Sequence, residues 1–165
     1  MAMKRTQAMM AAAAMLAAPV SAQTAPPAGA AVAARPVLTL AGARAVLMAA
    51  EAEAIKRGLK VSIAVVDPGG NPILHGRMDE ASLASIEISI GKARTAAGFN
   101  QPTKVMEDRL LAERGLRILT LPGVMVEGAV PVRIDGKLVG AVGVSGATSA
   151  EDGLIAAAGA AAVAK

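Results

Sequence analysis

One stretch constrains the fold of this chain more than any other, the residues Val61–Asp79 with the sequence VSIAVVDPGGNPILHGRMD. Two runs rich in β-forming residues flank a turn, and apolar residues alternate through the first run with the period of a strand. Pro68 suits the entry of a turn, and Gly69 and Gly70 tolerate positive φ. The stretch therefore predicts a β-hairpin, whose second strand carries the only histidine of the chain, His75.

A second hairpin and four helices are predicted around the first hairpin. Strands are expected at Gly128–Ile134 and Lys137–Ser145, because β-forming residues flank the two-residue hairpin signal Asp135-Gly136. Apolar periodicity and capping residues predict helices over Thr39–Arg57, Ser82–Gly98, about Thr103–Arg114 and from Ser149 to the end. The strands come in hairpins and not in βαβ crossovers, so we expect an α+β domain with an antiparallel sheet and helices packed on it.

Composition restricts what this domain can do. The chain has 165 residues and no cysteine, which excludes disulfides, thiol nucleophiles and thiolate metal sites. Lys4 and Arg5 lie in a predicted leader, and the rest of the chain has 15 basic and 13 acidic side chains. There is no basic stripe and there are no stacking aromatic residues, so we expect no nucleic-acid partner.

The first residues are expected to be a secretory signal peptide, Met1–Ala22. It combines a charged start, an apolar run over Ala8–Ala18, and small residues at a cleavage site after Ala22. A flexible linker is expected over Gln23–Pro36, which is rich in proline and small residues, followed by one domain over residues 37–165. These features predict a periplasmic or secreted protein; an uncleaved anchor or amphipathic helix is the alternative.

Four side chains are candidates for holding a ligand. His75 is able to ligate haem iron or another metal, and Met78 can be a soft axial ligand. Arg77 and Lys92 can pair with the carboxylates of an anionic ligand. Strand alternation places His75 and Arg77 on one face, and we expect the hairpin to bring imidazole, guanidinium and thioether to the rim of one aliphatic cleft. The alternative is a surface histidine, an Arg77–Asp79 surface pair, a core methionine and a solvated helix face.

Six stretches in this order resemble the GlcG/HbpS-like family of haem-binding proteins. They are VSIAVVDPGG (61–70), GRMD (76–79), ASIEI (84–88), KARTAA (92–97), LPG (121–123) and VPVRIDGKLVGAVGVSG (130–146). The resemblance covers nearly all of residues 38–163. It implies a profilin-like, GlcG-like single domain, with an antiparallel sheet of about five strands flanked by α-helices. Arg77, Met78, Asp79 and Lys92 are the polar or ligand-capable positions that match the family pattern.

The resemblance also implies a cofactor and partners. Some members bind haem or a related tetrapyrrole, members assemble into higher oligomers, and one secreted branch senses iron and redox state beside a membrane sensor kinase. We therefore expect an exported haem-binding protein that stores, carries or senses haem or iron, with His75 or Met78 on the iron. Two other hypotheses are an oligomeric accessory module without a prosthetic group and, with less support from the residues, an enzyme acting on a small organic acid.

Overall fold

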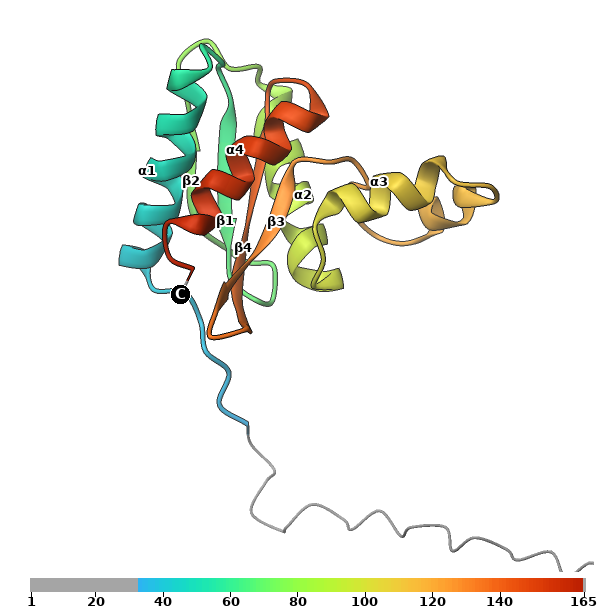
Figure 1. Ribbon diagram of the computed structural model, residues 1–165, viewed down its shortest axis with the longest axis horizontal. Helices are drawn as coiled ribbons and strands as arrows, with labels where there is room; N and C mark the ends of the chain where they lie inside the picture. Colours follow the sequence, from blue (N-terminus) through green and yellow to red (C-terminus); the bar gives the residue numbers. More distant parts are fainter. Residues whose placement is uncertain (1–32, 165) are drawn as a thin grey trace, which may run out of the picture. The chain divides into compact units, whose positions relative to one another are not determined.

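Two β-hairpins and four α-helices make up the described part of the computed structural model, residues 33–164 (Figure 1). In chain order the elements are α1 (Leu40–Lys56), β1 (Ser62–Val66), β2 (Pro72–Arg77), α2 (Ala84–Phe99), α3 (Thr103–Leu111), the 3₁₀ helix η1 (Gly115–Thr120), β3 (Ala129–Ile134), β4 (Lys137–Ser145) and α4 (Ser149–Ala161). The predicted signal peptide and most of the predicted linker, residues 1–32, lie outside the described residues.

The strands form one antiparallel sheet in the order β2-β1-β4-β3, so each hairpin stays intact and β1 pairs with β4 at the centre. The expected α+β class is therefore confirmed. The expected number of about five strands is wrong for residues 33–164, which contain four. Those four are the strands that the residue patterns predict. Between α3 and β3 the chain forms η1 and irregular structure instead of a further strand.

Helices cover both faces of the sheet (Figure 1). On one face, α1 and α4 bury an aliphatic core with Val46, Ile63, Val142 and Ile155 among its members. On the other face, α2 packs against β1, β4 and β3 through a smaller, alanine-rich cluster that includes Ala93 and Ala141. All five residues of β1 are buried, as expected for a strand that has a neighbour on both sides and helices on both faces.

Local chemistry explains where these elements begin and turn. The side chain of Thr39 caps α1 by accepting a hydrogen bond from Gly42 N at 3.1 Å. In the first turn, Asp67 Oδ1 accepts from Gly69 N at 2.8 Å and Asn71 N at 2.9 Å. In the second turn, Asp135 and Gly136 have φ values of 51° and 73°, which the tight two-residue hairpin requires. At the start of α4, Thr148 and Glu151 form a capping box, in which the Thr148 side chain accepts from Glu151 N and the Glu151 side chain accepts from Thr148 N.

An arm made of α3 and η1 extends from the end of α2 and away from the sheet (Figure 1). It has a small core of its own, in which Met106, Ile118 and Met125 pack with Phe99 and Leu110. Helix α3 ends at Leu111, earlier than the predicted Arg114, because the backbone is extended at Ala112 and left-handed at Arg114. Residues 103–123 are hereafter called the arm.

Candidate functional site

His75 lies on the edge strand β2, and its side chain points toward α2. Its Nε2 is 3.4 Å from Ser89 Oγ, while the Ser89 hydroxyl donates to the carbonyl oxygen of Ile86 at 2.8 Å. A hydroxyl carries a single proton, so while Ser89 donates to Ile86 it can only accept from His75 Nε2–H, which is the tautomer consistent with this contact. His75 Nδ1 then keeps its lone pair and has no hydrogen-bond partner within residues 33–164.

The surroundings of His75 favour its neutral form. The residue is half-buried, and this burial lowers the pKa of His75 below the ordinary value of 6.5. The nearby Glu87 carboxylate raises the pKa and offsets the effect of burial only in part. A neutral imidazole is the form that can bind iron and other metals.

Arg77 shares a face of the sheet with His75. Arg77 pairs with Ser62, and Ser62 Oγ lies 2.8 Å from Ser85 Oγ of α2, which identifies this face as the α2 side. Side chains at every second position of a strand point the same way, so His75 and Arg77 both lie on that side. The Arg77 side chain is exposed. The edge strand therefore presents an imidazole and a guanidinium beside the first turns of α2.

Met78 lies on the opposite side. It packs against the core under α1, together with Leu47 and Leu74. The prediction that all three groups meet at one cleft is therefore wrong, because strand alternation separates Met78 from His75. Met78 and Arg77 both line a small hollow next to α1, and His75 does not line it.

Lys92 is also separate from the other three candidates. Its Nζ lies 2.8 Å from Asp152 Oδ2, and both side chains are buried. The ammonium group sits close to Gly128, just before β3, and β3 is the sheet edge opposite to β2. The structure thus brings His75 and Arg77 together and places Lys92 elsewhere, with its charge already balanced by a carboxylate.

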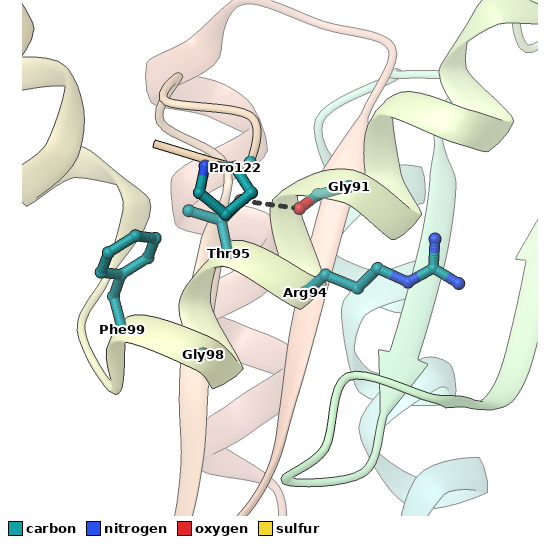
Figure 2. Close-up of a pocket in the computed structure, with 7 residues that line it drawn as sticks. Gly91, Arg94, Thr95, Gly98, Phe99 and Pro122 are labelled. Atoms are coloured by element: carbon teal, nitrogen blue, oxygen red, sulfur yellow. Dashed lines mark hydrogen bonds between the residues drawn. The ribbon is translucent and has the colours of Figure 1, made fainter. Parts of the chain in front are cut away.

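An apolar hollow of about 410 Å³ lies on the other flank of α2, between this helix and the base of the arm (Figure 2). Its lining residues are Gly91, Arg94, Thr95, Gly98, Phe99, Pro122 and Gly123. Thr95 Oγ1 holds the loop of the arm by accepting from Val124 N at 2.8 Å. The Arg94 side chain points away from Phe99 and Pro122, and its Nε donates to Gly70 O at 3.1 Å.

This hollow is a feature that reasoning from the sequence missed. The only signal for it was the Leu121-Pro122-Gly123 break, whose position against α2 no local pattern reveals. A second hollow, of about 200 Å³, lies beside α1 and the edge strand and includes Arg44, Met48 and His75 in its lining. Among the residues described, no three His, Cys, Asp or Glu side chains cluster in a way that would hold a metal ion. Within residues 33–164, no helix combines the length and apolar character that crossing a membrane requires.

Comparison with protein families gives one match over almost the whole domain. Residues 38–161 match the family model described as "Haem degrading protein HbpS-like". The GlcG protein of Escherichia coli is 41% identical over 109 residues, which cover 66% of this chain and 81% of GlcG.

Solved structures give the same relationship. A double mutant of HbpS from Streptomyces reticuli superposes with a TM-score of 0.75 at 35% identity, over 88% of this chain and 97% of that one. A crystal structure of a PduOC–haem complex superposes with a TM-score of 0.70 at 28% identity, over 77% of this chain and 95% of that one. Sequence and structure therefore agree on a single family.

Proposed function

The chain belongs to the HbpS-like family, and from this premise we propose that it binds haem at the edge strand β2, with His75 as the iron ligand. The family description concerns haem, and a structural neighbour at 28% identity is a haem complex. The observation that carries the proposal is the state of His75, a half-buried imidazole with a lowered pKa and an unpaired Nδ1.

The residues at this edge fit the chemical needs of haem. Iron in haem proteins takes an axial nitrogen, sulfur or oxygen ligand, and His75 is the only imidazole in a chain without cysteine or tyrosine. The exposed Arg77 on the same face offers a guanidinium to a propionate. Haem would supply an iron centre able to bind a further ligand or exchange an electron. The protein's part is to keep Nδ1 of His75 unprotonated through the contact of Nε2 with Ser89, and to provide the Arg77 guanidinium for a propionate.

Titration of the apo protein with hemin tests the proposal. We expect a Soret band that saturates near one haem per chain and shifts with imidazole ligation. His75→Ala should lose the shifted band, and Arg77→Ala should weaken affinity by about tenfold, corresponding to the roughly 1.5 kcal/mol of one charge-assisted hydrogen bond. Met48→Ala is the matched control, because Met48 is a 66% exposed thioether on α1 that the proposed site does not use.

The control variant Met48→Ala distinguishes haem binding at the edge strand β2 from haem binding in the hollow beside α1. A spectrum that is unchanged in His75→Ala but altered in Met48→Ala would move the site to the α1 side. The absence of any Soret change at equimolar hemin would favour the alternative of an accessory module without a prosthetic group. A protein that carries or senses haem should bind it reversibly, which transfer to apomyoglobin would measure.

We also propose that the protein is exported. The support is the composition of residues 1–22, with Lys4 and Arg5 before an apolar run and small residues before the cleavage site. The mass of the mature protein from a periplasmic extract should correspond to a chain that begins at Gln23. A sensor kinase in the membrane remains a predicted partner, and co-purification from membranes would test it.

A further inference from the structure

The 3₁₀ helix η1, in the outer part of the arm, sorts its side chains into three rows (Figure 1). A 3₁₀ helix has three residues per turn, so side chains at i and i+3 lie above one another. Gly115 and Ile118 form the inward row, and Ile118 is buried because it packs with Met106 and Met125. The other two rows therefore face outward, and they differ in chemistry.

One outward row consists of leucines. Leu116 and Leu119 are 74% and 60% exposed, and Leu111 at the end of α3 is 78% exposed. Scattered exposed leucines are ordinary, but a cluster of them on a projecting segment marks a contact surface. The arm projects away from the sheet, so these side chains are free to meet another molecule (Figure 1).

The other outward row is basic. Arg117 belongs to it, and Arg109, Arg114 and Arg117 line an open hollow of about 360 Å³ with a single acidic residue, Glu113. None of these three arginines forms an ion pair within residues 33–164. Three guanidinium groups against one carboxylate leave an excess of two positive charges. The hollow is therefore suited to anionic groups such as phosphates.

A lipid surface fits this pattern better than a protein surface does. A specific protein interface takes about 20–30 residues from each partner, whereas these two rows and their neighbours present three leucines and three arginines. A lipid bilayer requires no such area, because a few apolar side chains enter the acyl boundary while cations beside them reach the phosphate groups. Leu116 and Arg117 are neighbours on η1, so their rows lie side by side and both contacts can form together.

We propose that the tip of the arm, residues 109–119, docks on an anionic phospholipid surface. The three leucines enter the boundary between headgroups and acyl chains, and the three arginines bind lipid phosphates. The contact is peripheral and reversible, since few apolar side chains take part in it. It uses neither His75 nor the start of α2, so it does not depend on haem.

Co-sedimentation with vesicles of phosphatidylcholine and phosphatidylglycerol tests the proposal. Binding of the wild type should rise with the fraction of phosphatidylglycerol and fall with salt. Arg114→Gln/Arg117→Gln should weaken binding about 30-fold, because each basic residue near an anionic surface contributes about fivefold. Leu116→Ser/Leu119→Ser should weaken it at least about tenfold, because two leucines no longer leave water.

Two variants away from the arm are the matched controls, and both should bind vesicles as the wild type does. Ile55→Ser/Leu154→Ser removes two apolar side chains that are 63% and 52% exposed on α1 and α4. Lys60→Gln/Lys137→Gln removes two exposed cations. The full chain is compared with a chain that begins at Gln23, so that any binding through residues 1–22 is recognised by its loss. Circular dichroism checks that every protein is folded.

Three results would overturn the proposal. The first is a folded chain from Gln23 that does not bind vesicles containing phosphatidylglycerol, or binds them equally well without the two leucines or the two arginines. The second is binding to poly-glutamate but not to vesicles, which would assign the arginines to an acidic protein partner. The third is a change of oligomeric state in the arm variants without vesicles, measured by light scattering, which would assign the leucines to a contact between copies.

Discussion

Lys92 Nζ lies 2.8 Å from Asp152 Oδ2, and the two side chains are only 3% and 2% exposed. The pair links α2 on one face of the sheet to the start of α4 on the other, at the end where β4 leaves the sheet. Gly128 makes room for it, because a Cβ there would come within 2.5 Å of Lys92 Nζ. Asp152 Oδ1 also accepts from Ala147 N at 3.1 Å. Burial raises the pKa of Asp152, and the interaction with Lys92 opposes this shift.

Breaking this pair should be costly, because the remaining charge would be buried without a partner. Lys92→Met or Asp152→Asn alone should lower the free energy of unfolding by about 3–5 kcal/mol. The double variant Lys92→Met/Asp152→Leu should recover most of that loss, since it leaves no charge. Urea denaturation of the three variants measures both effects. A loss below about 1 kcal/mol in each single variant would show that water already reaches the pair.

Gly143 and Gly98 should respond in opposite ways to alanine. A Cβ at Gly143 would overlap the main chain of Ser89 and Ala93 in α2, whereas nothing lies within 4 Å of a Cβ at Gly98. Gly143→Ala should therefore destabilise the protein by about 1–3 kcal/mol, because helix and sheet have to separate. Gly98→Ala should stabilise it by about 0.5–1 kcal/mol through helix propensity. Thermal unfolding of both variants would show whether the signs differ as expected.

His75 should titrate below the ordinary histidine pKa. The chain has one histidine, so its imidazole proton is followed by NMR without assignment. We expect a midpoint under 6.5 in the apo protein and a still lower one in Glu87→Gln, which removes the carboxylate that raises it. Between the folded and unfolded pKa values the unfolded chain binds more protons, so stability should fall as pH decreases through that window. A midpoint at or above 6.5 would contradict the burial of the ring.

Thr95 should control the attachment of the arm. Its hydroxyl donates to Gly91 O at 2.9 Å and accepts from Val124 N at 2.8 Å. Thr95→Val keeps the shape but leaves the Val124 amide without a partner, which should cost about 1–3 kcal/mol. Hydrogen exchange at Val124 should accelerate in Thr95→Val and stay slow in Thr95→Ser. Equal exchange rates in the two variants would mean that the hydroxyl does not hold the loop.

Most of the fold was predictable because its elements are defined locally. The turn residues of both hairpins and the caps at Thr39 and Thr148 act within a few neighbouring residues, and all of them occur where predicted. The arm was harder to predict. Its small core joins Met106 to Ile118 and Met125, contacts across the chain that no periodic pattern encodes. The family resemblance was correct, but residues 33–164 contain four strands and not the five expected from it.

The candidate site was predictable only in part, for the same reason. Strand alternation places His75 and Arg77 together, and this much follows from local geometry. The partner of Lys92 lies on α4, and the hydroxyl that contacts Nε2 of His75 comes from α2. Both depend on how helices cross the sheet, which the spacing of residues in one segment cannot specify. Their roles in binding a cofactor remain predictions.

The central pairing of β1 with β4 has a consequence for how the chain folds and for how it tolerates insertions and deletions. Each hairpin can form quickly by itself. Pairing β1 with β4 joins the two hairpins and closes a loop over residues 78–128, which contain the arm. The entropy lost on closing so long a loop grows only with the logarithm of its length, about 0.6 kcal/mol for each doubling. Insertions or deletions at the tip of the arm should therefore leave the rate and the extent of folding almost unchanged.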